Sequence, residues 1–448
     1  MHGFTIESMN VLIQIAQFLL SLSILVFLHE LGHFVFAKLF RTRVEKFYIF
    51  FNPWFSLFKK KIGETEYGIG WLPLGGYVKI SGMIDESMDK EQMKKPPQPW
   101  EFRSKPAYQR LLIMVGGVTV NFILALVIYS TTLYVWGEQY LPTKNAKYGI
   151  MCDSVALDIG LRNGDKVLSV DHKEVENFNK IFHDIVVNNA RSIQVERDGQ
   201  VVDIPIREEY LARLLKSEAF ITTRIPFYVN DFSKESPARD AGIQVDDQIV
   251  GLNGAEIKFF DEFRTRMKDL RGKEVSVTVL RDGKRITYNF MSTADGKIGV
   301  WPVGDLSRFF NLVKVDYSFF EAIPAGISKG FGNAISYVKQ LKLIFTPKTK
   351  AYESLGGFIK IGSFFPTSWN WETFWEMTAL LSIILAIMNL LPIPALDGGH
   401  VMFLLYEIIS GRKPGEKFLE YAQIAGMLIL LALLLYANGN DVVQLFRK

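Results

Sequence analysis

The chain has 448 residues, of which 49% are hydrophobic and 22% are charged, and its formal net charge is +4. This length allows two or three domains, and this composition is typical of a protein that lies partly in a membrane and partly in water. The small net charge says nothing about nucleic acid, but no basic run is interleaved with aromatic residues, which argues against a nucleic-acid-binding protein. The single cysteine, Cys152, excludes an intrachain disulfide and a thiolate metal site.

The first apolar segment covers about residues 11–37, which is long enough to cross a bilayer as a helix. No basic region precedes it and no small-residue cleavage site follows it. We therefore expect a retained span and not a signal peptide that is removed.

Three ionisable residues, His29, Glu30 and His33, lie inside this span with the spacing H-E-x-x-H. Residues four apart share one face of a helix, so both imidazoles can reach one metal ion, with Glu30 beside them. Two histidine ligands and a carboxylate base are typical of a zinc hydrolase. The alternative is a pair of core histidines bonded to helix neighbours, which the cost of burying polar groups in lipid disfavours.

Basic residues cluster after the first span, before a second uncharged span at 111–137, and again at 410–418. Because Lys and Arg favour the cytoplasmic side, residues of about 38–110 and 410–418 are predicted to be cytoplasmic. Both termini and residues 138–370 are then extracytoplasmic, and the two histidines lie near the cytoplasmic end of the first span.

The large segment after the second span contains a duplication. Residues 160–172 match 242–254, and 195–200 match 279–284. Each copy predicts a turn, a strand, a helix and a β-hairpin with Asp-Gly at its tip. The pattern resembles PDZ domains, which bind extended peptides by strand addition. Peptide binding and steric gating remain open as alternatives.

Apolar residues recur at near-helical spacing in 327–345, with lysines between them. This predicts an amphipathic helix, either at the membrane surface or packed against other helices. Two further spans follow, at 377–396 and 421–440. The short apolar stretch 401–409 is expected to continue as a helix after a break at Pro392 and Pro394.

A catalytic zinc site needs a third protein ligand. Asp397 ends an uncharged run, after two prolines and before two glycines that allow close backbone approach. A broken helix at membrane depth is tolerated only inside protein or beside water, and an anionic Asp there needs a cation. His400 is an alternative ligand.

The H-E-x-x-H motif in a first span, together with N-x-x-P-x-P-x-L-D-G-G (389–399) in a late span, resembles the site-2 protease family of intramembrane metalloproteases. Four spans with tandem PDZ domains resemble its bacterial regulator-of-sigma-E protease branch. The resemblance implies that His29, His33 and Asp397 bind one zinc ion and that Glu30 is the catalytic base. It also implies that Asn389 contacts the substrate.

Three further segments match the family in part. Residues 68–78 look like its membrane-reentrant β-hairpin, which makes Gly68, Gly70, Gly75 and Gly76 candidate substrate-binding residues. Residues 117–121 fall where the family has G-P-x-x-N, with Val118 in place of proline. Residues 355–357 replace its S-G-P loop, also without the proline. For all three, packing is the alternative to substrate contact.

The predicted fold is therefore a multi-pass α-helical membrane protein with four transmembrane helices, a membrane-associated β-hairpin and two extracytoplasmic α/β PDZ-like domains. We expect the first two spans in 1–137, the PDZ-like domains in 138–218 and 219–305, a linker with the amphipathic helix in 306–370, and the last two spans in 371–448. The expected function is zinc-dependent cleavage of transmembrane segments in a bacterial inner membrane, after a first cut elsewhere in the substrate. Its partners would be single-span membrane proteins or peptides and the lipid bilayer. A non-catalytic PDZ scaffold and a metal-binding membrane protein are the alternatives.

Overall fold

The computed structural model describes residues 6–73, 75–83, 96–217, 219–346, 349 and 351–447. Contacts divide the chain into two compact units. The helical unit comprises Met1–Gly137, Asp316–Phe345 and Tyr352–Lys448. The duplicated unit comprises Glu138–Val315 and Thr346–Ala351.

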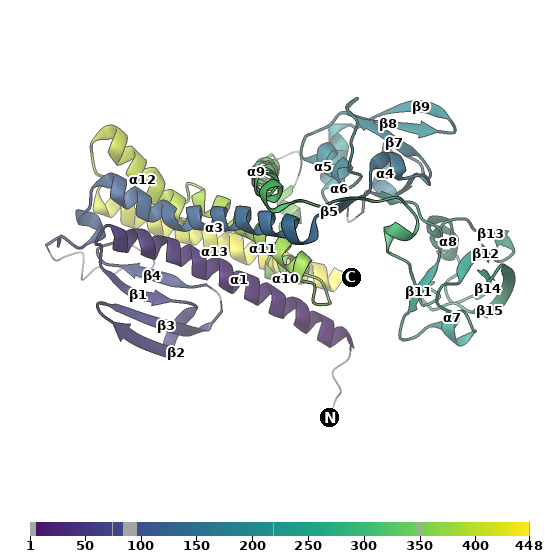
Figure 1. Cartoon of the computed structure of the whole chain (residues 1–448), viewed down its shortest axis with the longest axis horizontal. Coiled ribbons are helices and arrows are strands. Elements are labelled where there is room, and N and C mark those ends of the chain that lie inside the picture. The colour runs from purple at the N-terminus through teal and green to yellow at the C-terminus, as the bar shows by residue number, and fades with distance from the viewer. Residues whose placement is uncertain are drawn as a thin grey trace. The chain divides into compact units, whose positions relative to one another are not determined.

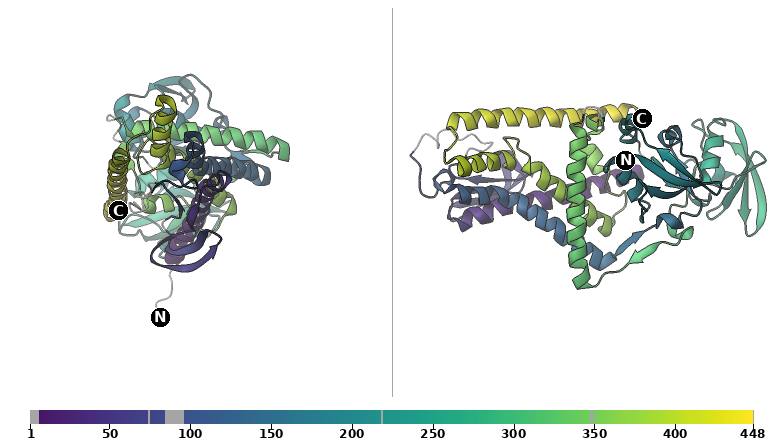
Figure 2. Two further views of the ribbon diagram at one scale, coloured as in Figure 1. Left: turned by 90° about the vertical axis from the view of Figure 1, so that its left-hand side faces the viewer. Right: turned by 90° about the horizontal axis from the view of Figure 1, so that it is seen from above.

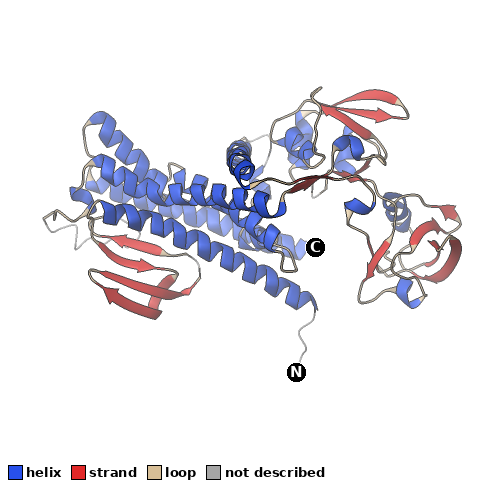
Figure 3. Ribbon diagram, viewed as in Figure 1, coloured by secondary structure: helices blue, strands red, loops and turns tan. Residues whose placement is uncertain are grey.

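Helices of very different lengths make up most of the helical unit (Figures 1 and 3). They are α1 (Ile6–Leu39), α3 (Ala107–Trp136), α9 (Phe319–Ile344), α10 (Phe358–Gly362), α11 (Trp371–Leu390), α12 (Asp397–Ser410) and α13 (Glu416–Arg447). Four of the described helices contain segments long and apolar enough to cross a membrane: Met9–Leu39, Ala107–Trp136, Trp371–Leu390 and Lys417–Gln444. The four predicted spans are confirmed as helices of this kind.

The bounds of the third span differ from the prediction. α11 begins at Trp371 and ends at Leu390, whereas the sequence pattern placed the span at 377–396. Leu391 is extended because it precedes Pro392, and a residue before proline is driven out of the helical region. The chain resumes as a helix at Asp397, so the expected break followed by a second helical stretch is confirmed as α12.

Small residues let α1 and α3 pack with their backbones close together. A Cβ added to Gly32 would lie 2.4 Å from the Gly116 carbonyl oxygen, and one added to Gly116 would lie 2.8 Å from that of Gly32. Helices in lipid associate through close packing of this kind. This contact fixes α3 beside the stretch of α1 that carries the H-E-x-x-H motif.

A four-stranded sheet lies alongside α1 (Figure 1). Its strands are β1 (Val44–Tyr48), β2 (Phe51–Ile62), β3 (Thr65–Leu72) and β4 (Tyr77–Ile80), in the order β2-β3-β1-β4. The predicted hairpin over 68–78 is wrong in its pairing. β1 lies between β3 and β4, parallel to β3 and antiparallel to β4, and the true hairpin is β2–β3.

Helix α9 crosses α3 through small residues (Figure 2). A Cβ on Gly326 would lie 2.3 Å from Ser130 Oγ, and one on Gly330 would lie 2.4 Å from a Leu126 methyl group. The predicted apolar stripe is a different face, because Phe331 and Ile335 are at least half exposed. One face of α9 therefore packs against α3, while the apolar stripe stays largely exposed, with Phe331 also meeting the Phe122 ring of α3 edge to face.

The duplicated unit is built from short strands and helices. Its strands are β5 (Glu138–Tyr140), β6 (Ile150–Cys152), β7 (Lys166–Val170), β8 (Ser192–Arg197), β9 (Gln200–Pro205), β10 (Ile221–Thr223), β11 (Val229–Phe232), β12 (Gln248–Leu252), β13 (Ala255–Glu256), β14 (Glu274–Arg281), β15 (Lys284–Met291), β16 (Val300–Pro302) and β17 (Val313–Val315). Its helices are α4 (Ser154–Ile159), α5 (Lys180–Val186), α6 (Leu211–Leu214), α7 (Pro237–Asp240) and α8 (Phe260–Met267). The sheets β7-β8-β9 and β13-β12-β14-β15 occupy equivalent places in the two sequence copies.

Each of the two copies contains an equivalent Asp–Arg ion pair. Asp165 accepts hydrogen bonds from Arg197 at 2.7 and 2.8 Å, and Asp247 accepts from Arg281 at 2.6 and 2.7 Å. Each arginine also donates to the carbonyl of the glycine that ends the preceding helical turn. Because both carboxylates are almost fully buried, the pair ties strand to turn in each copy.

Candidate metal centre

Three side chains from opposite ends of the chain meet inside the helical unit. His29 and His33 lie on one face of α1, and Asp397 is the first residue of α12. His29 Nε2 and His33 Nε2 are 3.2 Å apart, and Asp397 Oδ2 lies 3.2 and 3.3 Å from them. Among the described residues this is the one group of three side chains identified as able to hold a metal ion.

Hydrogen bonding sets which nitrogen of His33 faces the centre. His33 Nδ1 lies 2.8 Å from the Ile113 carbonyl oxygen, so it carries the ring proton and donates it. When the ring is neutral, as a metal ligand must be, Nε2 carries a lone pair that faces the Asp397 carboxylate. Two electron-rich atoms 3.3 Å apart in a buried place repel each other unless a cation lies between them.

The spacing of the three atoms fits zinc. Ligand atoms about 2.0–2.1 Å from a tetrahedral ion lie about 3.3–3.4 Å from one another. The three separations of 3.2–3.3 Å match this value. In addition, Asp397 Oδ2 is buried and makes no hydrogen bond that would satisfy it. Two imidazoles and a carboxylate are ordinary zinc ligands, so these residues fit the ion.

Glycines hold Asp397 in place. A Cβ on Gly398 would lie 2.2 Å from the Leu391 carbonyl oxygen, and one on Gly399 would lie 2.5 Å from Pro394 Cα. Gly426 of α13 touches the same loop, since its Cβ would overlap the Pro394 carbonyl oxygen. The predicted close backbone approach is thus between the first turn of α12 and the loop that precedes it.

Helix α3 supplies two residues that the sequence pattern did not place at the centre. A Cβ on Gly117 would lie 2.5 Å from His33 Nε2 and 2.7 Å from His29 Cε1, so a glycine is needed to make room for both rings. Asn121, one turn later, lies with its amide nitrogen 3.3 Å from His29 Nδ1. The sequence had matched residues 117–121 to a family motif, with packing or substrate contact as the alternatives, and residues four apart share one helix face.

Glu30 faces the sheet side of the centre. Its carboxyl group interacts electrostatically with His29, His33 and Asp397, and with the backbone amide of Val78 in β4. A Cβ on Gly76 would lie 3.5 Å from Glu30 Cγ, which places the start of β4 against this side chain. The carboxylate therefore lies between the three-atom cluster and an edge strand.

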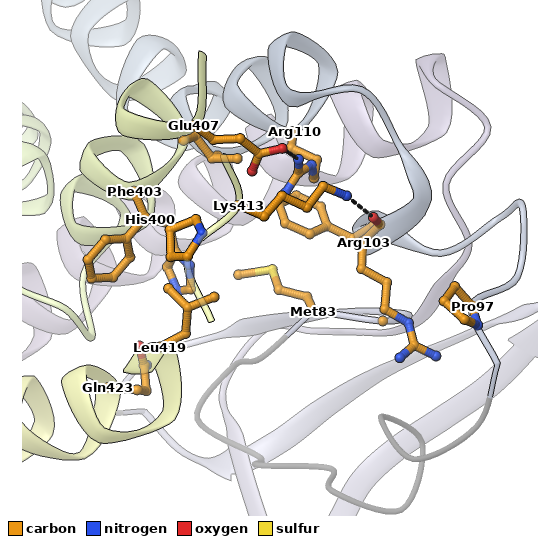
Figure 4. Close-up of a pocket in the computed structure, with 14 residues that line it drawn as sticks. Met83, Pro97, Arg103, Arg110, His400, Phe403, Glu407, Lys413, Leu419 and Gln423 are labelled. Carbon is orange, nitrogen blue, oxygen red and sulfur yellow. Dashed lines mark hydrogen bonds and ion pairs between the residues drawn. The ribbon is translucent and has the colours of Figure 1, made fainter. Parts of the chain in front are cut away.

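The structure places two other predicted residues, Asn389 and His400, at different sites. Asn389, near the end of α11, has its amide nitrogen 3.2 Å from His29 Nε2, so it borders the centre. His400, the alternative ligand, lines a separate cavity of about 230 Å³ with Phe403 and Glu407 (Figure 4). That cavity is lined by residues around the start of α3 and by α12 and α13, and His400 is not part of the three-residue cluster.

The remaining candidate glycines have structural explanations. A Cβ on Gly68 would overlap the Tyr48 ring, and one on Gly70 would lie 2.3 Å from the Phe51 carbonyl oxygen. Gly75 has a backbone φ of +131°, which residues with a side chain rarely adopt. Among the described residues, no atom lies within 4 Å of a Cβ added there. Of the four, Gly76 is the one that reaches Glu30.

Comparison with known proteins identifies the family. The family model described as Peptidase family M50 matches residues 17–433. The chain belongs to peptidase family M50. M50 peptidases are zinc metalloproteases, and the His29–His33–Asp397 cluster is consistent with a zinc site of this family.

Three M50-like relatives cover nearly the whole chain. A Treponema pallidum relative, whose name describes a zinc metalloprotease, is 28% identical over 95% of this chain and 98% of its own length. The Regulator of sigma E protease of Haemophilus influenzae is 27% identical over 98% of this chain and all of its own length. The Regulator of sigma-E protease RseP of Escherichia coli is 27% identical over 96% of this chain and 98% of its own length.

The single cysteine, Cys152, is poorly suited to act as a nucleophile or as a metal ligand. Cys152 is buried in β6 of the duplicated unit, and its burial raises the pKa of the thiol to about 12. A thiol that stays protonated at neutral pH is a poor nucleophile and a poor ligand.

Proposed function

We propose that this protein is an intramembrane zinc protease that cuts peptide bonds inside the transmembrane segments of single-span membrane proteins. One observation carries the proposal. Three zinc-type ligand atoms converge at 3.2–3.3 Å within a bundle of helices long and apolar enough to span a membrane. A non-catalytic scaffold would leave this cluster and Glu30 without a role.

In this proposal His29, His33 and Asp397 would hold one zinc ion per chain. When bound, the ion would lower the pKa of a coordinated water and polarise the scissile carbonyl. Glu30 accepts the proton of the attacking water and returns it to the leaving amine nitrogen. Asn389, beside His29, donates to the substrate backbone.

We further propose that β4 binds the unwound substrate as an added strand. A transmembrane helix hides its carbonyls in internal hydrogen bonds, so it must be extended before it can be cut. β4 is an edge strand of the sheet and pairs with β1 on one side. Val78 of β4 lies opposite Phe47 of β1, and the Glu30 carboxyl group interacts with the Val78 backbone amide, which supports an open edge of β4 beside the site.

Cross-linking tests this strand addition. We replace Cys152 with alanine, inactivate the protein with Glu30→Gln, and place a cysteine at Val78 or at Lys79. Side chains alternate along a strand, so each position should form a disulfide with substrate cysteines of one parity only, and the two parities should differ. Mass spectrometry of the cross-linked peptides reads the pattern. Cross-links to every successive substrate position from both sites would contradict the model.

The duplicated unit, in our proposal, contains two PDZ-like domains, at 138–218 and 219–305, that filter substrates by the size of their outer region. The equivalent Asp–Arg pairs and hairpins of the two copies support a tandem domain. The basic residues at 38–110 and 410–418 support an orientation with this unit outside the cytoplasm of a bacterial inner membrane. The largely exposed apolar stripe of α9 supports its placement, in the linker 306–370, at the membrane surface.

Two reporters test function and filter together. Both carry the same transmembrane segment; one has a short outer tail and the other a folded outer domain. Purified protein in liposomes should cut the short reporter within the apolar segment, and zinc chelation should abolish this. The long reporter should be cut only after residues 147–300 are deleted from the protease. Product ends outside the apolar segment contradict intramembrane cleavage, whereas equal cutting of both reporters by the full chain contradicts the filter alone.

A further inference from the structure

We propose that Asn121 is a positioning residue that fixes the tautomer of His29 by accepting a hydrogen bond from its Nδ1–H. The inference rests on the proposed metal centre and concerns a residue outside the three-ligand cluster. Asn121 lies on α3, has no solvent exposure, and its amide lies 3.3 Å from His29 Nδ1.

The two histidines need the same kind of support. A histidine that binds a metal through Nε2 must carry its proton on Nδ1 and donate it to an acceptor, which also fixes the plane of the ring. His33 donates to the Ile113 carbonyl at 2.8 Å. Among the described residues, the Asn121 side chain lies within hydrogen-bond distance of His29 Nδ1.

The amide must present its oxygen to do this. As placed, the Asn121 amide nitrogen faces Nδ1, while Oδ1 is buried and makes no hydrogen bond. The two ends of an amide have the same shape, so a half-turn of the amide group brings Oδ1 to Nδ1 without moving the rest of the side chain. With Nε2 bound to a metal, this is the orientation in which donor meets acceptor.

The surroundings hold Asn121 at this position. Gly117, one turn earlier, admits both imidazoles against α3. Ser382 of α11 donates a hydrogen bond of 2.7 Å to the Asn121 backbone carbonyl and is itself fully buried. Ser382 thus links α11 to the backbone of α3 at Asn121, while the Asn121 side chain is directed at His29. A residue with packing as its sole function would not need a polar side chain here, since burying an amide without partners is costly.

Zinc binding by the purified full-length chain tests the inference. Asn121→Leu keeps a similar volume but removes the acceptor, and Asn121→Asp keeps an acceptor at the same place. Loss of an outer partner of a metal-bound histidine lowers metal affinity by about 10- to 100-fold. We expect Asn121→Leu to bind Zn²⁺ that much more weakly in competition with a chromophoric chelator, and Asn121→Asp to stay close to wild type. Should Asn121→Leu not fold, a Zn²⁺ affinity of Asn121→Asp as weak as that expected for the leucine variant would overturn the inference.

Ser382→Ala is the matched control, because it removes a hydrogen bond to the backbone of the same asparagine without touching the imidazole, and its Zn²⁺ affinity should stay close to that of wild type. A positioning role predicts that, at the same Zn²⁺ concentration, Asn121→Leu shows a smaller rise in melting temperature than wild type but keeps the melting temperature of the zinc-free protein. Equal Zn²⁺ affinity of wild type and Asn121→Leu would overturn the inference. Absence of Zn²⁺ binding by the wild type would instead overturn the proposed metal centre, so the two failures can be told apart.

Discussion

Replacing Glu30 with glutamine is expected to abolish cleavage of a transmembrane reporter while leaving the zinc content unchanged. Glutamine has nearly the same shape but cannot accept the proton of the attacking water. General base catalysis is worth about 10²- to 10⁴-fold in rate, so the loss should be at least of this size. The measurements are the initial rate of cleavage in liposomes and metal analysis of the purified variant.

The control is Glu64→Gln, which changes a glutamate of the same unit that is half exposed and pairs with Lys38 on the surface. A surface ion pair contributes little to stability, so this variant should cleave at the wild-type rate. Full activity of Glu30→Gln would contradict the role assigned to this carboxylate. Loss of zinc in the same variant would show instead that Glu30 holds the site together.

A single methyl group at Gly117 is expected to disrupt the metal centre. In Gly117→Ala the new Cβ would lie 2.5 Å from His33 Nε2 and 2.7 Å from His29 Cε1, closer than real side chains allow. The rings or α3 must therefore move. A shift of about 1 Å in a catalytic group costs about 10²-fold in rate, and zinc affinity should fall with it.

The matched control is Gly439→Ala, because nothing lies within 4 Å of a Cβ added at that helical position. Replacing glycine by alanine in an open helical site usually stabilises the helix slightly, by about 0.5–1 kcal/mol. Zinc stoichiometry and reporter cleavage are measured for both variants. Wild-type values for Gly117→Ala would contradict the close packing of α3 against the two imidazoles.

Local sequence patterns determined the spans, the histidine pair and the duplication of this protein. The length of an apolar segment can be read directly from the sequence, so the four spans could be recognised without a structure. The third span ends earlier than predicted because Pro392 ends the helix. Residues four apart meet on any helix, and this placed His29 and His33 together. The duplication was also readable, because each copy repeats the same turn residues at the same spacing.

Contacts between distant segments were decided by the tertiary structure. The order β2-β3-β1-β4 depends on which strands pair, and the predicted hairpin was wrong for this reason. Asp397 and His400 lie three residues apart on α12, and only the placement of this helix beside α1 shows that Asp397, and not His400, joins the cluster. Gly117 and Asn121 reach the imidazoles because Gly32 and Gly116 bring α1 and α3 close together. Periodicity reports which residues share a face, but only packing decides what that face meets.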